Sequence, residues 1–351
     1  MKKFFESEVE EAALEWLDSI GYQVAFGPDI AHDGDRPERT GYTEVILRNR
    51  CMAMVQKLNP DLDGWALLEV MRKLTATHFP STVDTNQAIH KMFVEGITVE
   101  AQKKDGSYQS EIVRLFDFEH PEKNDWLAVN QFTIIEGDYE RRPDVIIFVN
   151  GLPIAVIELK NPADENATIW SAFQQIQTYK AQLPALFRTN ELCIISDGLE
   201  ARVGSLTADR ERYLPWRTIE GEDLAPSTMP KLEVLIKGLF AKEHLLDYIR
   251  HFVVFEDEGG KKLKKIAGYH QFHAVRSAVE SVVEASSAKG DHRGGVIWHT
   301  QGSGKSLTMA FFAGKVIVHP KMENPTLVVL TDRNDLDEQL FGTFSRCQEL
   351  L

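Results

Sequence analysis

Residues 143–160, Pro-Asp-Val-Ile-Ile-Phe-Val-Asn-Gly-Leu-Pro-Ile-Ala-Val-Ile-Glu-Leu-Lys, decide which fold this sequence can form. Both halves of the segment are rich in Val, Ile and Phe, which favour β-strands, and Asn150-Gly151 between them is a strong hairpin signal. Asp144 and Glu158 interrupt the apolar pattern. A buried carboxylate is costly unless it binds a cation or a partner, so these two residues are the first candidates for a functional site.

Around this hairpin, helical and strand patterns follow one another along the chain. The expected helices cover residues 5–20, 61–76, 86–95, 168–182 and 231–250, and the expected strands cover 111–116, 130–135, 144–149, 153–160 and 192–196. The polar stretch 256–265, which contains four lysines, is expected to be a solvated linker. The order of these elements predicts a compact α/β unit.

Composition limits the class of protein. A chain of 351 residues that is 43% hydrophobic is long enough for two domains with a connection between them. The sequence has no apolar run long enough to span a membrane, and its three cysteines form no Cys-x-x-Cys pair, so we expect a protein of the cytoplasm with no membrane partner. The net charge of -14 argues against indiscriminate binding to nucleic acid but leaves room for a local site.

The residues of the hairpin outline a hydrolytic site. Lys160 follows Glu158 by two positions and therefore lies on the same strand face. Asp144 and Glu158 could hold Mg²⁺, while Lys160 could orient an attacking water and stabilise charge on a phosphate. On spacing alone, a structural ion pair at a strand end is the commoner explanation of such a pattern.

Pro143-Asp144 followed by Glu158-x-Lys160 resembles the PD-(D/E)xK nuclease superfamily. The resemblance implies an α/β nuclease domain in which Asp144 and Glu158 bind the metal and Lys160 is catalytic. It also implies that the two carboxylates share one face of the hairpin.

The helix expected after the hairpin extends this resemblance. Gln175 and Tyr179 are four residues apart, on one helical face, and match the Gln-x-x-x-Tyr element of RecB-like nucleases. Without the hairpin, they would be read equally well as a polar stripe on a helix. The resemblance further implies an acidic residue from the first helix, for which Glu8 and Glu11 are candidates.

The register of the hairpin decides whether one ion can reach both carboxylates. A two-residue turn would place Asp144 and Glu158 on opposite faces, because side chains alternate along a strand. A three-residue connection, with Gly151 in a left-handed bulge, would pair Phe148 with Leu152 and return both carboxylates to one face as diagonal neighbours. We therefore predict a bulged or odd-length turn.

A second motif, Gly-Gly-Val-Ile-Trp-His-Thr-Gln-Gly-Ser-Gly-Lys-Ser at 294–306, predicts an apolar strand, a glycine-rich phosphate loop and a helix. In such a loop, backbone N–H groups wrap the phosphates, the lysine reaches the β- and γ-phosphates and the serine binds Mg²⁺. The residues expected to bind ATP are Gly302, Ser303, Gly304, Lys305 and Ser306. His299 stands where the usual pattern has glycine.

The neighbouring segments resemble superfamily 2 helicases. Gln271, in Tyr-His-Gln-Phe-His at 269–273, matches by position the glutamine that reads adenine, although it could also be an ordinary helix-surface residue. His270 and His273 lack a third ligand, so no metal is expected there. Residues 327–333 are expected to form a buried parallel strand and resemble motif Ia. No Walker B box, arginine finger or second RecA-like lobe follows, so we expect no ATP hydrolysis by this chain alone.

The order of the two motifs resembles that of the R subunit of type I restriction enzymes. It predicts a PD-(D/E)xK endonuclease domain at 1–230, a helical connection and linker at 231–265, and part of a RecA-like parallel-sheet ATPase lobe at 266–351. The resemblance implies Mg²⁺ and ATP as cofactors, double-stranded DNA as substrate, and modification (methyltransferase) and specificity subunits as partners. Two alternatives share these motifs: a DNA-repair nuclease-helicase, and an ATP-dependent assembly module with a vestigial nuclease.

Overall fold

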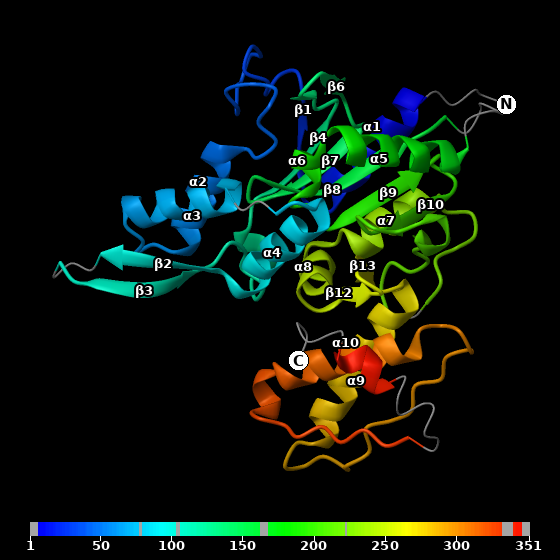
Figure 1. Cartoon of the computed structure of the whole chain (residues 1–351). Coiled ribbons are helices and arrows are strands. Elements are labelled where there is room, and N and C mark those ends of the chain that lie inside the picture. Colours follow the sequence, from blue (N-terminus) through cyan, green and yellow to red (C-terminus); the bar gives the residue numbers. More distant parts are fainter. Residues whose placement is uncertain are drawn as a thin grey trace.

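A mixed seven-stranded sheet forms the centre of the structure, a computed structural model that describes residues 6–76, 79–102, 106–161, 168–221, 223–331 and 340–345 (Figure 1). In spatial order its strands are β1 (Gln23–Phe26), β4 (Trp126–Asn130), β7 (Val145–Val149), β8 (Leu152–Leu159), β9 (Leu192–Ser196), β10 (Ala201–Gly204) and β11 (Leu214–Pro215). The pairs β1–β4 and β8–β9 are parallel, and the other pairs are antiparallel. The α/β class is confirmed.

Helices cover both faces of the sheet, which explains why its central strands are apolar throughout. Val145 and Ile147 of β7 pack in the same core cluster as residues of α1 (Glu6–Ser19) and α7 (Lys231–Leu239). Ile146 and Phe148 pack on the opposite face, against α5 (Ile169–Gln182) and α6 (Pro184–Phe187). The expected helices at 5–20 and 168–182 and the strand at 192–196 are confirmed.

A helical insertion with a projecting hairpin separates β1 from β4 in the sequence (Figure 1). It comprises α2 (Arg48–Leu58), α3 (Gly64–Ala76), α4 (Thr82–Glu95), β2 (Ile97–Gln102) and β3 (Tyr108–Val113). The helices expected at 61–76 and 86–95 are present, but α2 and β2 were not predicted. The single strand expected at 130–135 is wrong, because Gln131 takes a left-handed φ of 55° and divides it into β4 and β5 (Ile134–Glu136), which pairs with β6 (Tyr139–Arg141).

The expected linker at 256–265 is also wrong. These residues form most of a hairpin, β12 (Val253–Glu258) with β13 (Lys261–Ile266), around Gly259-Gly260. Its Lys264 is buried and donates hydrogen bonds to Glu191 and Asn86, so the lysine run was not a solvated segment. The helix expected at 231–250 is two helices, α7 and α8 (Lys242–His251), because the chain leaves helical geometry at Ala241.

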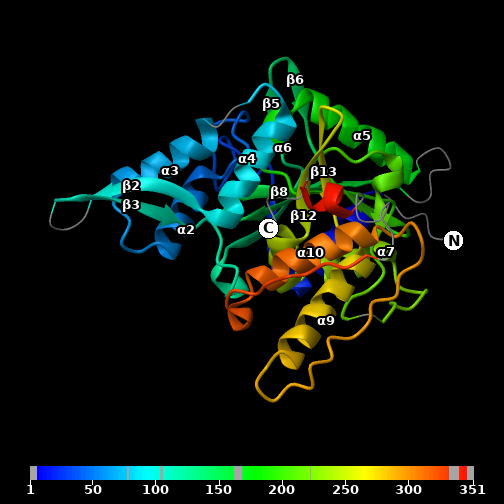
Figure 2. The same ribbon diagram turned by 60° about the horizontal axis from the view of Figure 1, so that its bottom comes forward.

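The carboxy-terminal part contains α9 (Tyr269–Ala285) and α10 (Lys305–Ile317), which pack side by side and lie next to α8 (Figures 1 and 2). The strands expected within 294–300 and 327–331 are wrong, since neither segment is a strand. Trp298 and Leu330 are 89% and 88% exposed. A parallel strand needs neighbours to satisfy its backbone, and the described residues supply none here. Residues 332–333 of the expected motif Ia strand lie outside the described residues.

Candidate active site

The β7–β8 hairpin has a plain turn and a bulge further along. Val149 pairs with Leu152, and the two turn residues, Asn150 and Gly151, have φ values of 52° and 76°. This is the geometry that an Asn-Gly turn favours, so the predicted odd-length turn is wrong. The register shifts between Ile147 and Phe148 instead, which leaves one extra residue on β8.

The bulge brings the two carboxylates to one face. Beyond it Val145 pairs with Ile157, so the next position sets Asp144 across from Glu158. Ile146 and Val156 lie two positions from Asp144 and Glu158, and therefore on the same face, and both belong to the core on the α5 side. Asp144 and Glu158 therefore face α5. The prediction of a shared face is confirmed, as a directly opposed pair and not as diagonal neighbours.

Lys160 completes this cluster. Its Nζ donates to Glu158 Oε1 at 2.7 Å and to the Leu159 carbonyl at 2.9 Å. The Leu159 N–H donates to Asp144 Oδ2 at 2.7 Å. The main chain therefore holds the Asp144 carboxylate, and the Lys160 ammonium holds the Glu158 carboxylate. The side chain of Glu158 is 3% exposed and that of Lys160 is 18% exposed. The ends of two central strands therefore bring together two carboxylates and one ammonium group, of which the Glu158 carboxylate is buried.

α5 places Gln175 and Tyr179 over the same residues. Tyr179 is buried, and burial together with the negative charge of Glu158 raises the pKa of its hydroxyl well above the usual range; Asp144 adds to the effect and Gln175 opposes it. The hydroxyl therefore keeps its proton at neutral pH and remains a hydrogen-bond donor beside the carboxylates.

A glutamate of the first helix, Glu10, contacts the polar end of a buried strand. Glu8 and Glu11 are exposed, whereas Glu10 binds the end of β4. Glu10 Oε1 accepts from Asn130 Nδ2 at 2.7 Å, and its Oε2 accepts from Gln131 Nε2 at 2.6 Å. The missed signal was the polar pair Asn130-Gln131 at the end of a buried strand, which needs a polar partner.

The donor set fits a hard cation. Asp144 and Glu158 offer carboxylate oxygens, and Mg²⁺ commonly binds to only one or two protein carboxylates while it keeps several waters. Within the described ranges, no group of three or more His, Cys, Asp or Glu side chains has a metal-binding arrangement, so water or substrate oxygens would have to complete the shell.

The glycine-rich loop that is expected to bind phosphate, called the phosphate loop below, lies directly before α10. Gly302 and Gly304 have left-handed φ values of 81° and 79°, and Gly304 is the N-cap of the helix. Lys305 Nζ donates to the carbonyls of His299 and Thr300 at 3.1 and 2.9 Å, so the lysine lies along its own loop. Ser306 follows in the first helical turn.

Gln271 connects this loop to α9 and is not a helix-surface residue. Its Oε1 accepts from the Gly268 N–H at 2.9 Å, and its Nε2 donates to the Gly304 carbonyl and to Thr308 Oγ1, both at 3.1 Å. The side chain is buried. To read an adenine base, it would have to exchange some of these bonds, so that role stays a prediction.

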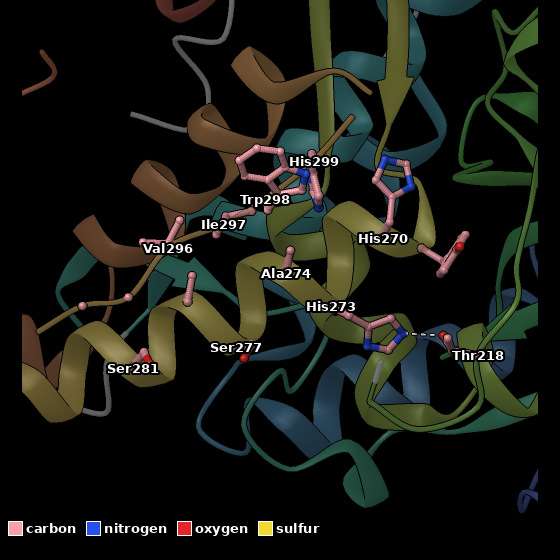
Figure 3. A pocket seen from close by; sticks show the side chains of 14 residues that line it. Thr218, His270, His273, Ala274, Ser277, Ser281, Val296, Ile297, Trp298 and His299 are labelled. Atoms are coloured by element: carbon pink, nitrogen blue, oxygen red, sulfur yellow. Dashed lines mark hydrogen bonds between the residues drawn. The ribbon is translucent and has the colours of Figure 1, made fainter. Parts of the chain in front are cut away.

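A cavity of about 370 Å³ lies between α9 and residues 294–299 (Figure 3). His270 and His273 project from α9, and Trp298 and His299 come from the facing segment. His273 Nε2 lies 2.7 Å from Thr218 Oγ1, and burial lowers the pKa of His273 to about 4. Its ring is therefore neutral near pH 7 and belongs to a structural hydrogen bond.

Two family models match the chain. Residues 3–212 match the model described as "Type I restriction enzyme R protein N terminus", and residues 270–350 match that of the SWI2/SNF2 ATPase. The first match contains the β7–β8 hairpin and α5, and the second contains the phosphate loop. No helix in the described part of the chain is long and apolar enough to cross a membrane.

Several curated proteins are similar over most of the chain. The type I restriction enzyme HindI endonuclease subunit of Haemophilus influenzae is 44% identical over 99% of this chain and 33% of that protein. A protein of Methanocaldococcus jannaschii, provisionally described as the type I restriction enzyme MjaIXP endonuclease subunit, is 35% identical over 96% of this chain and 34% of its own length. The chain thus spans about a third of these relatives.

Proposed function

Because the chain belongs to the family of type I restriction enzyme R proteins, we propose that Asp144, Glu158 and Lys160 cut double-stranded DNA in the whole restriction subunit. The observation that carries the proposal is the register of the β7–β8 hairpin. It sets the two carboxylates on one face, with the Lys160 ammonium 2.7 Å from Glu158. A structural ion pair would need no second carboxylate directly across the hairpin.

Each residue has a distinct role in this proposal. Asp144 and Glu158 hold Mg²⁺, which would lower the pKa of a bound water and neutralise charge on the phosphate. Lys160 donates a hydrogen bond to the attacking water or to a phosphate oxygen. Tyr179 keeps its proton and, with Gln175, orients Glu158 from the α5 side.

The phosphate loop gives the second part of the proposal. The residues that bind the phosphates and Mg²⁺ of ATP in the whole subunit are Gly302, Ser303, Gly304, Lys305 and Ser306. Gln271 reads the adenine base. Lys305 would exchange the two loop carbonyls for phosphate oxygens. ATP-driven translocation of DNA then requires the remaining parts of the ATPase, and site recognition requires modification and specificity subunits.

The test uses the full-length subunit assembled with its methyltransferase and specificity partners. We expect Mg²⁺-dependent DNA cleavage that falls by roughly 100-fold or more in Asp144→Ala, Glu158→Ala and Lys160→Ala, while ATP binding is retained. Glu15→Ala, an exposed change on α1, is the control and should cleave normally. Normal cleavage by the Glu158→Ala complex would refute the site. A subunit that cuts free DNA ends without any methyltransferase would be a repair nuclease.

A further inference from the structure

Glu10 binds a backbone bend at Asn130 and Gln131, and this bend lies next to Asp144 of the proposed active site. Both of its carboxylate oxygens are used, one by the Asn130 side chain and the other by the Gln131 side chain, at 2.7 and 2.6 Å. Hydrogen bonds to a carboxylate are stronger than those between neutral groups. The glutamate therefore fixes two consecutive side chains at the end of β4 from a different element, α1.

The bend that Glu10 holds has an unfavourable backbone. Gln131 has a φ of 55°, in the left-handed region that a non-glycine residue adopts only when its surroundings require it. Gly27 packs directly against the bend: its N–H donates to the Asn130 carbonyl at 2.8 Å, and a Cβ on Gly27 would lie 2.4 Å from the Gln131 carbonyl oxygen. The conformation is thus imposed by α1 and by the end of β1 together.

The bend is joined to Asp144 through the main chain. The Gln131 N–H donates to the Asp144 carbonyl at 3.0 Å, just beyond the last β4–β7 pair, Asn130 with Val145. The position of Gln131 therefore determines where the Asp144 backbone lies before β7 begins. The Asp144 carboxylate is fixed in turn by Leu159 N–H, across the hairpin.

We propose that Glu10 is a positioning residue for DNA cleavage, which acts on Asp144 through the Asn130-Gln131 bend. The inference rests on the proposed nuclease function of Asp144 and Glu158. Without the clamp, the bend can relax from its left-handed conformation and displace Asp144 from its place across from Glu158. Because Mg²⁺ demands near-octahedral geometry, a small displacement of one carboxylate weakens the site.

The test measures the Mg²⁺ dependence of cleavage by the full-length subunit in its assembled complex. For Glu10→Ala we expect the Mg²⁺ concentration for half-maximal cleavage to rise roughly 10- to 100-fold, as is typical when a group that orients a metal ligand is removed. Glu15→Ala, an exposed change on the same helix, should leave the Mg²⁺ dependence unchanged. A merely structural role would lower thermal stability without moving this dependence.

A double variant of the bend distinguishes a positioning role of Glu10 from direct metal binding. Asn130→Ala with Gln131→Gly removes both amide side chains but keeps the left-handed backbone and the N–H that binds Asp144. If Glu10 acts through the bend, adding Glu10→Ala to this double variant changes the Mg²⁺ dependence no further. A further loss would show that Glu10 binds the metal or DNA itself and would overturn the proposal.

The remaining outcomes are also decisive. If Glu158→Ala cleaves normally in parallel, the proposed nuclease site fails. If Glu158→Ala is inactive while Glu10→Ala matches Glu15→Ala, only the positioning role fails. If the Glu10→Ala subunit does not assemble, Glu10→Gln is tested instead, because it keeps the size of the side chain and one acceptor oxygen. An intermediate Mg²⁺ dependence then supports the positioning role of Glu10. An unchanged Mg²⁺ dependence refutes it.

Discussion

The Glu158 carboxylate and the Lys160 ammonium lie 2.7 Å apart, and the Glu158 side chain is only 3% exposed. Removing charges from water costs several kcal/mol, and mutual attraction repays this only with good geometry and additional hydrogen bonds. Here the Leu159 carbonyl accepts from the ammonium, while Leu159 N–H holds the opposing Asp144. An apolar pair at the same positions would pack as well, which favours a chemical role for these charges over a stabilising one.

His273 should make the stability of the chain depend on pH. Burial lowers its pKa to about 4, whereas an unfolded histidine titrates near about pH 6.5. Between these values the unfolded chain binds a proton that the folded chain does not, so the free energy of unfolding falls as the pH is lowered from about 6.5 to about 4. We expect a decrease of about 2 kcal/mol from this group, measured by denaturant unfolding.

The comparison for this prediction is His273→Gln against the exposed His292→Asn. His273→Gln should flatten the decrease in the free energy of unfolding between about pH 6.5 and about pH 4, and His292→Asn should leave that decrease unchanged. An identical pH profile in all three proteins would mean that the pKa of His273 is not lowered in the folded chain, and would contradict the prediction.

At the scale of elements, a buried ion pair contributes to the contact between the hairpin β12–β13 and the region around the central sheet. Lys264 Nζ donates to Glu191 Oε2 at 2.6 Å, and His90 Nδ1 lies 3.1 Å from Glu191 Oε1. Burial raises the pKa of Glu191, but Lys264 and then His90 outweigh it, so the net shift is downward. Glu191 is therefore ionised at neutral pH.

Removing one partner of this pair should be more harmful than removing both. Glu191→Gln leaves the Lys264 ammonium buried without a counter-charge, and we expect a loss of about 3–5 kcal/mol in the free energy of unfolding. Glu191→Gln combined with Lys264→Met should recover part of that loss, because neither residue then needs a charged partner. Lys231→Met, a lysine at the first turn of α7 that is partly exposed, is the control. Additive losses in the double variant would contradict this account.

The same hairpin shows where sequence reasoning failed. The alternating Lys-Lys-Leu-Lys-Lys pattern of 261–265 was read as a solvated run, since nothing local signals that Lys264 meets Glu191, which is far away in the chain. The β7–β8 hairpin was predicted with its turn residues and its shared carboxylate face. Its bulge was expected in the turn but lies further along the ladder, because the Asn-Gly turn fits a two-residue hairpin and tertiary packing sets the extra residue. Glu10 was missed for a similar reason, as its partners come from β4.

At the scale of the whole molecule, Asp247 of α8 joins the two parts of the chain. Its carboxylate binds Lys315 of α10 and accepts from Arg276 of α9 at 3.3 Å, while Arg276 also donates to Glu243 at 2.9 Å. α10, the helix that begins at this loop, thus contacts α8 directly through Lys315 and Asp247. Such a contact gives the two proposed sites a physical connection.

The 351-residue chain should hydrolyse no ATP. Hydrolysis requires a Walker B carboxylate and an opposing lobe in addition to the phosphate loop, and Lys305 now donates to its own loop carbonyls. Release of phosphate from ATP should match the buffer blank, whereas the full-length subunit should turn over and lose this activity in Lys305→Ala. Lys321→Ala, an exposed change beyond α10, is the control. Turnover by the chain that disappears with Lys305→Ala would contradict the prediction.

Residues 294–300 and 327–331, which form no strand, bear on how the chain behaves in concentrated solution. Val296 and Trp298 are 91% and 89% exposed, and Val328 and Leu330 are 76% and 88% exposed. Exposed apolar side chains on segments that pair with no strand among the described residues favour association, both with one another and with the strands of a second molecule. We therefore expect the purified chain to self-associate as its concentration rises.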